Sequence, residues 1–272
     1  MSTRTRPLSS AFGRLALAAV VLFGAACAAR APLTPPADAP EPDRYLYEQG
    51  QANLEQKKWL TAREYFRRLV DGYPQSTYRA DAKLGIGDSY LGEDSPEGHV
   101  YAINEYREFL SFFPTHPRAD YAQYRLALSH YQQMRAPQRD QTATHDTIRE
   151  MELFLERYPQ SALVPEVTAK LREARDRLGR ADYEVGLHYY RQKWYPGAMD
   201  RFAALLKRDP EFTYRDAVYF YMGEMLMSEG VKRPAEALPY FDRLVKEFEQ
   251  SEYLERAKER IARIKAGGIG GL

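Results

Sequence analysis

From Arg44 onward the chain repeats itself with a period of about 34 residues, and no other feature restricts its fold as strongly. The complete pattern is, in order, a small residue, an aromatic one, a second small residue, a second aromatic one and a proline, and the other copies keep part of it. The clearest copy has these residues at Gly186, Tyr189, Ala198, Phe202 and Pro210. Small residues let two helices approach closely, aromatic rings fill the groove beside them, and proline ends the second helix. The pattern therefore predicts a helix pair in every copy.

Four further copies can be aligned along the chain. The residues in frame are Gly50, Ala62, Phe66 and Pro74 in the first copy, Gly87, Tyr90, Ala102, Tyr106 and Pro114 in the second, Ala127, Met151 and Phe154 in the third, and Gly223, Ala237 and Phe241 in the fifth. Five ordered copies with small and aromatic residues in register indicate one repeated structural unit. Its length and residue types are those of tetratricopeptide repeats.

Two segments depart from the simple repeat. The third copy fits only if Arg135 to His145 is an inserted loop, after which His145 and Asp146 would precede and cap a helix beginning near Thr147. A final helix, from about Ser251 to Lys265, is expected to cap the array. Because no segment alternates apolar and polar residues over a strand's length, we predict an all-α fold. It is a right-handed superhelical array of about five tetratricopeptide-type helix pairs with a capping helix, over residues 44–265.

The N-terminus has the features of a lipoprotein signal peptide, residues 1–26. Arg4 and Arg6 supply positive charge, and the apolar run from Leu15 to Phe23 is too short to span a bilayer. The following Gly24-Ala25-Ala26-Cys27 resembles a lipobox, although Gly24 stands where leucine is usual. We expect Cys27 to become a lipidated mature N-terminus that anchors the protein. Ordinary cleavage, which would leave a free thiol at Cys27, stays open as an alternative.

Residues 27–43 are rich in proline and predict an extended tether between the anchor and the repeats. Residues 266–272 are rich in glycine and predict a flexible tail. Ala28 follows the cysteine in place of aspartate, which resembles sorting to the outer membrane in Gram-negative lipoproteins. The sequence thus predicts a protein anchored to a membrane rather than one that spans it.

Composition argues against several kinds of activity. Lys and Arg number 39 and Asp and Glu 38, so a net charge of +1 gives no general attraction for nucleic acid. The five histidines show neither metal-binding nor catalytic spacing, and the single cysteine forms no internal disulfide. Gly85-Ile86-Gly87 falls within a predicted helix, so helix packing explains it better than phosphate binding. We predict a non-enzymatic protein that uses no cofactor, metal or nucleotide.

The chain contains 21 tyrosines, which suit half-buried surfaces that contact other proteins. In an array of helix pairs the first helix of each pair lines the concave face, which is the usual binding surface. In the aromatic series around Tyr47 and Phe66, Phe66 falls at a core position and Tyr47 on the concave side. The sequence therefore predicts a protein-binding scaffold.

The order of several motifs resembles the BamD family of outer-membrane assembly lipoproteins over nearly the whole mature chain. The motifs are Pro114-Thr115-His116-Pro117, Asp120-Tyr121 with Tyr124, Arg139-Asp140-Gln141, Arg157 to Ser161, Arg177-Leu178, Tyr183 and Tyr189-Tyr190. Pro165, Gly24 in the lipobox and the glycine-rich tail depart from the family pattern. Generic repeats would not be expected to produce this order.

The resemblance implies a periplasmic protein, lipid-anchored at the outer membrane, that docks on the periplasmic domains of the barrel-forming component BamA. It also implies binding of unfolded outer-membrane proteins, association with other assembly lipoproteins, and no cofactor. In the family the N-terminal repeats are associated with substrate. Our candidate substrate-binding residues are Tyr47, Gln51, Asp88, Tyr121 and Tyr124. For the partner at the C-terminal repeats the candidates are Arg201, which aligns with a family arginine, and Tyr190.

A second interpretation is another periplasmic tetratricopeptide adaptor, such as a coordinator of the Tol-Pal system or of peptidoglycan-processing enzymes. The Tol-Pal coordinator usually lacks a lipobox and carries an N-terminal coiled coil. Cys27 and the proline-rich tether favour the assembly interpretation.

Overall fold

The computed structural model describes residues 33–37 and 39–267, and within these it consists of helices without strands. The predicted signal peptide, Cys27 and most of the glycine-rich tail lie outside the described residues. The helices are α1 (Pro42–Glu55), α2 (Trp59–Gly72), α3 (Arg79–Gly92), α4 (Pro96–Phe112), α5 (Ala119–Tyr131), α6 (Thr142–Arg157), α7 (Val164–Arg191), α8 (Tyr195–Arg208), α9 (Arg215–Met227), α10 (Pro234–Glu247) and α11 (Leu254–Lys265). The helical array thus begins at Pro42, within the segment expected to be tether.

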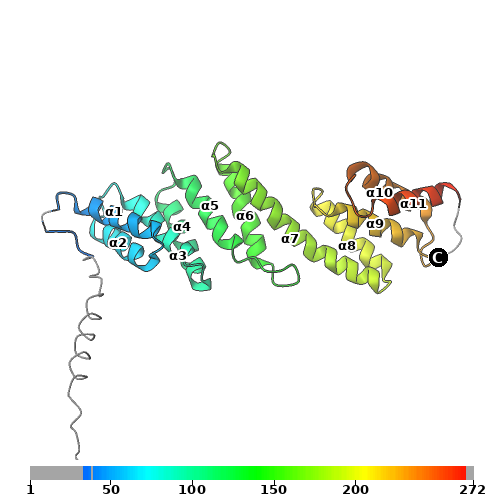
Figure 1. Cartoon of the computed structure of the whole chain (residues 1–272), viewed down its shortest axis with the longest axis horizontal. Helices are drawn as coiled ribbons and strands as arrows, with labels where there is room; N and C mark the ends of the chain where they lie inside the picture. The colour runs from blue at the N-terminus through cyan, green and yellow to red at the C-terminus, as the bar shows by residue number, and fades with distance from the viewer. Residues whose placement is uncertain (1–32, 38, 268–272) are drawn as a thin grey trace, which may run out of the picture.

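Successive helices pack as antiparallel pairs, which confirms the predicted array. Extensive contacts join α1 to α2, α3 to α4, α5 to α6, α7 to α8 and α9 to α10, while α11 packs on α10 as the expected cap. Figure 1 shows the pairs following one another along the long axis of the molecule. Contacts also join the first helices of neighbouring pairs, α1 with α3, α3 with α5 and α7 with α9. These first helices therefore line the inner side of the curve.

In four of the five pairs a glycine of the first helix faces a buried aromatic ring of the second, whereas α5 contains no glycine. A Cβ atom on Gly50 would lie 2.4 Å from Phe66, one on Gly186 would lie 2.5 Å from Phe202, and one on Gly223 would lie 2.4 Å from Phe241. The three phenylalanine rings are completely buried. Any larger residue at these glycines would push the helices apart. The small and aromatic residues that repeat in the sequence are therefore the residues that make this contact.

The glycines of α3 serve the same packing. A Cβ atom on Gly85 would also meet Phe66 at 2.4 Å, so that ring is enclosed between α1 and α3. A Cβ atom on Gly87 would lie 2.7 Å from Tyr106 of α4. This confirms that Gly85-Ile86-Gly87 is a packing motif within a helix.

The turns between pairs are held by hydroxyl groups that bond to the preceding first helix. Ser161 donates to Asp120 and Ser251 donates to Asp216, each at 2.6 Å, although each pair of residues is far apart in the sequence. Thr213 donates to Asp176 in the same way. In the second Tyr-Pro-Gln-Ser motif Ser161 therefore helps to fix the angle between two pairs, whereas Ser76 of the first motif accepts a hydrogen bond from the Tyr78 N–H within its own turn.

The predicted start of the sixth helix is wrong. α6 begins at Thr142 instead of near Thr147, and the inserted loop covers residues 132–141 instead of extending to His145. The side chain of Asp140 accepts a hydrogen bond from the Thr142 hydroxyl at 2.9 Å, which favours an earlier start. Thr147 is buried inside the helix, where its hydroxyl donates to the carbonyl oxygen of Ala143. His145 and Asp146 therefore lie in the first turns of α6 and do not cap it.

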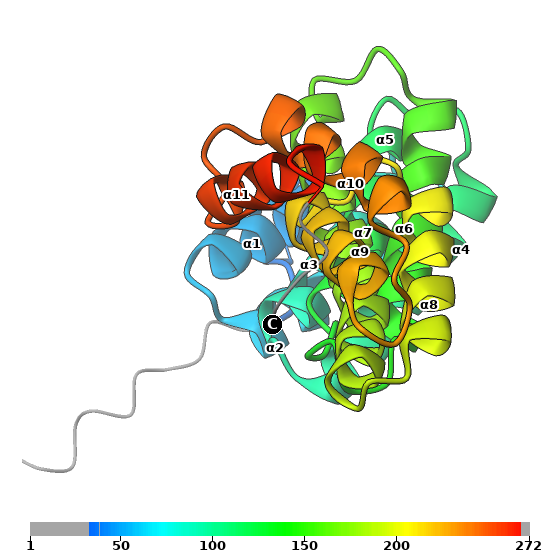
Figure 2. The same cartoon turned by 90° about the vertical axis from the view of Figure 1, so that its right-hand side faces the viewer.

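The longest helix, α7, is the first helix of the fourth pair and also packs against the third pair. Its 28 residues pack first against α6 and then against α8, so it joins an N-terminal half, α1 to α6, to a C-terminal half, α8 to α11. Figure 2, in which the C-terminal end faces the viewer, shows that successive pairs are turned relative to one another. Among the described residues no helix is both long and apolar enough to cross a bilayer.

Replacing Gly186 by alanine tests the glycine–aromatic contact. We expect Gly186→Ala to lower the free energy of unfolding by about 1–3 kcal/mol, because the added Cβ would overlap the Phe202 ring. Urea denaturation followed by circular dichroism measures this. Gly72→Ala is the control, since no atom lies within 4 Å of a Cβ there, and it should be neutral or stabilising by up to about 1 kcal/mol. Equal effects of the two substitutions would contradict the packing role.

Candidate functional site

The inner face of the N-terminal half begins with an aromatic stack on α1. The ring of Tyr47 stacks on Tyr78 with centroids 5.0 Å apart and touches the buried Phe66. Gln51 donates a hydrogen bond to the Tyr47 hydroxyl at 2.9 Å. Tyr47, Gln51 and Tyr78 are all half-buried, so each presents part of its side chain to the inner face. The structure thus brings the predicted residues Tyr47 and Gln51 together.

Asp88 of α3 is the centre of a buried hydrogen-bond cluster. Its carboxylate accepts from the hydroxyl of Tyr106 at 2.7 Å and from the hydroxyl of Tyr121 at 2.9 Å. Arg125 donates to the same carboxylate at 3.0 Å. Burial, and then the neighbouring Asp88, raises the pKa of Tyr106 and of Tyr121, so both hydroxyls stay protonated and donate. The cluster ties α3, α4 and α5 together.

Arg118, just before α5, contacts both α3 and the Tyr121 ring of the cluster. Its guanidinium donates to Asp81 at 2.9 Å and lies 4.6 Å from the centre of the Tyr121 ring. Arginine over a tyrosine ring gains a cation–π attraction while keeping exposed N–H groups for other acceptors. Half-buried rings and arginines therefore lie on α1, at the start of α3 and at the start of α5. We call this surface the N-terminal inner face, formed by Tyr47, Gln51, Tyr78, Arg118, Tyr121 and Arg125.

The five candidate substrate residues share the first helices but differ in access. Tyr47, Gln51 and Tyr121 are half-buried and can contact a ligand. Asp88 is 9% exposed with its carboxylate fully engaged, and Tyr124 is 6% exposed and donates to Glu166 of α7. Asp88 thus supports Tyr121 and Arg125 from beneath, whereas Tyr124 is a buried contact between α5 and α7.

Sequence reasoning missed three residues of this face, namely Tyr78, Arg118 and Arg125. Tyr78 lies in the Thr-Tyr-Arg segment that recurs at Thr213 to Arg215, so the repeat itself pointed to it. Arg118 and Arg125 carry no comparable signal. Their positions depend on the angle between neighbouring pairs, which the repeat pattern does not specify.

The C-terminal half has a second aromatic strip on its inner face. The ring centroid of Tyr190 in α7 lies 4.9 Å from that of Tyr221 in α9, which lies 5.9 Å from that of Tyr253, the residue just before α11. Beside them Arg260 makes a bidentate ion pair with Glu224, at 2.7 and 3.2 Å. We call this set of five residues the C-terminal inner face. Tyr190 was predicted, whereas the other four were not.

Arg201 lies apart from Tyr190. It is exposed on the second helix α8, next to the completely buried Phe202, as the sequence indicated. No hydrogen bond or ion pair occupies its guanidinium within the described part of the chain, and no ring contact joins it to Tyr190. The two candidate partner residues therefore lie on different helices and do not form one cluster.

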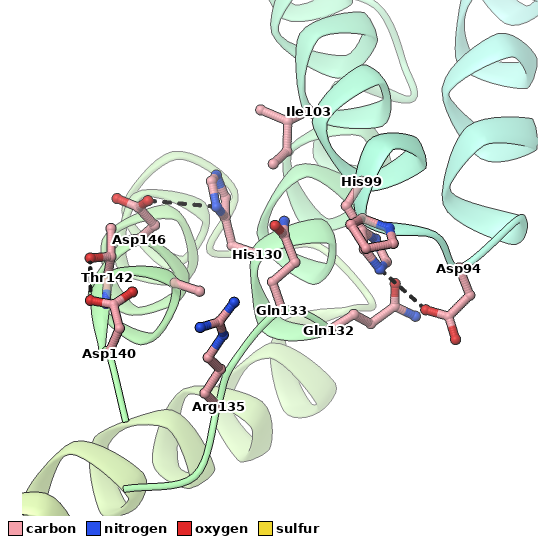
Figure 3. A pocket seen from close by; sticks show the side chains of 12 residues that line it. Asp94, His99, Ile103, His130, Gln132, Gln133, Arg135, Asp140, Thr142 and Asp146 are labelled. Carbon is pink, nitrogen blue, oxygen red and sulfur yellow. Dashed lines mark hydrogen bonds and ion pairs between the residues drawn. The ribbon is translucent and has the colours of Figure 1, made fainter. Parts of the chain in front are cut away.

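A polar pocket of about 570 Å³ lies between α4, α5 and the loop before α6. Figure 3 shows His130 facing Asp146 and His99 facing Asp94, with nitrogen–oxygen distances of 3.7 and 3.2 Å. Burial lowers the pKa of His130, which favours its neutral form. In the part of the chain that the structure describes, no three His, Cys, Asp or Glu side chains are grouped so that they could hold a metal ion. The pocket therefore supplies two His–Asp contacts and no metal-binding set.

Removing the Asp88 carboxylate tests the buried cluster. We expect Asp88→Ala to lower the free energy of unfolding by roughly 3 kcal/mol, because Arg125 and two tyrosine hydroxyls would lose their shared acceptor. Chemical denaturation measures the change. Asp200→Ala, at an exposed aspartate of α8, is the matched control and should stay within about 0.5 kcal/mol of the wild type. A similarly small change for Asp88→Ala would show that the cluster contributes little to folding.

Comparison with curated proteins gives BamD outer membrane protein assembly factors among the relatives. The BamD outer membrane protein assembly factor of Caulobacter vibrioides is 26% identical over 195 residues, 71% of this chain and 63% of that protein. The BamD proteins of Xylella fastidiosa and Vibrio cholerae are 24% and 25% identical, and the matches span 72% and 81% of their lengths. The chain therefore spans less than two thirds of the Caulobacter protein and somewhat more of the other two.

Among solved structures, the TPR2AB domain of yeast Sti1 in its complex with pHSP90 aligns with a TM-score of 0.48 and 14% identity. That alignment covers 82% of this chain and 84% of the Sti1 chain. A family model described as YfiO, outer membrane lipoprotein, matches residues 40–238, from just before α1 into α10. The match covers most of the helical array, and the chain therefore belongs to the YfiO/BamD family of outer membrane lipoproteins.

Proposed function

We propose that the protein is a non-enzymatic scaffold in the assembly of outer-membrane proteins. The observation that carries this proposal is membership of a family whose curated relatives are outer membrane protein assembly factors, on a chain folded as an array of helix pairs. The two inner faces supply what a scaffold needs, since each offers half-buried aromatic rings and charged groups to another chain.

The N-terminal inner face receives unfolded outer-membrane proteins in this proposal. An extended segment binds through pockets for alternate side chains and through hydrogen bonds along its backbone. Tyr47, Tyr78 and Tyr121 supply ring surfaces, and Gln51 and Arg118 supply donors. Asp88 holds the Tyr121 hydroxyl in place from beneath, and Tyr124 is buried against α7. Substrate contact is therefore expected chiefly at Tyr47, Gln51 and Tyr121 of the five candidates.

The C-terminal half docks on the partner that forms barrels, which we expect to be BamA-like and to offer its periplasmic domains. Arg201 is exposed and free to pair with a carboxylate of that partner. Tyr190 contributes from the inner face. Because α7 joins the two halves, one chain can hold substrate and partner at the same time. Other assembly lipoproteins are further expected partners.

A lipid on Cys27 would hold the array at the periplasmic face of the outer membrane. In the sequence the predicted tether lies between Cys27 and α1, which begins at Pro42. Anchoring by acyl chains needs no membrane-spanning helix. Mass spectrometry of the membrane-extracted N-terminus checks this, and an unmodified Cys27 would contradict it.

A photo-crosslinking side chain tests the substrate face. We expect a crosslinker at Tyr47 to capture an unfolded outer-membrane protein at least several-fold more efficiently than one at Tyr101. Tyr101 is a suitable control, because it is 53% exposed but lies on α4, a second helix in the same half. Gel analysis of the crosslinked products measures capture. Equal capture at the two positions would contradict binding on the inner face.

Charge reversal at Arg201 tests the partner face. We expect Arg201→Glu to reduce co-purification of the barrel-forming protein at least tenfold without unfolding the array, because a repelling charge replaces the exposed guanidinium. Quantitative mass spectrometry of pull-downs from the native envelope measures this. Arg68→Glu makes the same change at an exposed position of α2 and should have little effect. Wild-type pull-downs that contained Tol-Pal components or a wall hydrolase without a barrel protein would instead favour the adaptor interpretation.

A further inference from the structure

The two edges of the array differ in charge. Because successive helices are antiparallel, the turns within pairs lie on one edge and the turns between pairs on the other. In Figure 1 the α5–α6 loop and the α7–α8 turn lie on the lower edge, and the α6–α7 and α8–α9 turns on the upper. We call them the intra-pair edge (residues 56–58, 93–95, 132–141, 192–194 and 228–233) and the inter-pair edge (73–78, 113–118, 158–163, 209–214 and 248–253).

The intra-pair edge is basic and the inter-pair edge acidic. The cations of the intra-pair edge are Lys57, Lys58, Arg135, Arg139, Lys193, Lys232 and Arg233, against the anions Glu93, Asp94, Asp140 and Glu229. The inter-pair edge has one cation, Arg118, against the anions Asp209, Glu211, Glu249 and Glu252. The chain as a whole has a net charge of only +1, so this separation is a property of the fold.

Helix formation does not account for these cations. Lys58 and Arg233 occupy the N-cap positions of α2 and α10, where Ser, Thr, Asp and Asn are favoured and the helix dipole disfavours positive charge. Lys57, Lys193 and Lys232 have φ angles of 57°, 59° and 53°, a left-handed conformation that favours glycine. The four lysines and one arginine at these five positions are therefore not the residues that would stabilise the turns best.

Other residues of the chain do not neutralise the edge. Of its seven cations, only Arg233 makes an ion pair within the described residues, with Glu236. All seven side chains are exposed. Four of the five turns carry unpaired cations, while the second turn carries Glu93 and Asp94, which contact Arg63 and His99. The unpaired cations create a positive potential along the edge that attracts an anionic surface.

Both tryptophans of the chain lie beside these lysines. Trp59 follows Lys57-Lys58 directly, and Trp194 follows Lys193. Trp194 is 54% exposed and rests on Gly197 and Tyr189, which leaves one side of its ring open. Leu60, the residue after Trp59, is also 54% exposed. Exposed tryptophan next to lysine is typical of surfaces that contact the membrane–water interface.

We propose that the intra-pair edge lies against an anionic phospholipid surface. Its lysines and arginines would pair with lipid phosphates, and Trp194 and Leu60 would enter the headgroup region. The cations lie in the turns of the first, third, fourth and fifth pairs, so an extended anionic surface fits them better than a small ligand in one pocket. The inter-pair edge and its carboxylates would then face away from the membrane. This inference depends on neither substrate binding nor docking on a barrel protein.

Intrinsic tryptophan fluorescence tests the proposal on the intact mature protein. Vesicles are prepared with brominated acyl chains and either phosphatidylglycerol or phosphatidylcholine headgroups. We expect quenching with phosphatidylglycerol, little with phosphatidylcholine, and loss of quenching in about 1 M salt, where the screening length falls to about 3 Å. Flotation separately reports whether the protein is on the vesicle. It therefore distinguishes a protein that is bound by its anchor with the edge facing away from a protein that is not bound.

Two charge variants decide whether the edge is responsible. Replacing Lys57, Lys58, Lys193 and Lys232 by glutamine should abolish the quenching, since each charge strengthens attraction to anionic lipid roughly fivefold. The matched control replaces four exposed lysines elsewhere, Lys207, Lys246, Lys258 and Lys265, by glutamine and should quench like the wild type. Circular dichroism checks that both remain folded. Absent quenching, equal quenching with both headgroups, or equal loss in the two variants would overturn the proposal.

Discussion

The contact between a helical glycine and an aromatic ring is the interaction on which the rest of the structure depends. Gly50, Gly186 and Gly223 each leave room for a completely buried phenylalanine of the following helix. Dense packing at these points fixes the distance between the two helices of a pair. The polar contacts at the turns, such as Ser161 to Asp120, then set the angle from one pair to the next. Burial of apolar surface supplies the stability, and the turn contacts supply the direction of the array.

This division leaves the inner surface free for binding. Ring edges and arginines on α1, α3 and α5 face inward because the opposite sides of those helices are occupied by the core. The Asp88 cluster joins both levels, since it links the core residue Tyr106 to Tyr121 and Arg125 at the surface. Charged groups buried in this way need complete hydrogen bonding, and the three donors provide it. A rigid support of this kind limits the conformational entropy lost when another chain binds.

The long helix α7 joins the N-terminal and C-terminal halves of the array. An α-helix of 28 residues keeps the halves apart and in register, because its backbone hydrogen bonds resist bending. The same antiparallel order places all turns within pairs on one edge. The inner faces, the exposed Arg201 on α8 and the basic edge thus lie on different sides of a single array.

The sequence by itself determined the repeat, the helix pairs and the cap. Their signals are local: glycine, aromatic residue and proline recur at fixed spacing, and the interactions that they report lie within one pair. The cluster around Asp88, the cation–π contact of Arg118 with Tyr121, and the strip formed by Tyr190, Tyr221 and Tyr253 were decided only by the tertiary structure. The physical reason is that each joins different pairs, and the angle between pairs is set by side-chain packing and turn contacts that no repeat spacing encodes. The start of α6 was missed for a related reason, because the side chains of Asp140 and Gln141 favour a helix start that the repeat frame did not require.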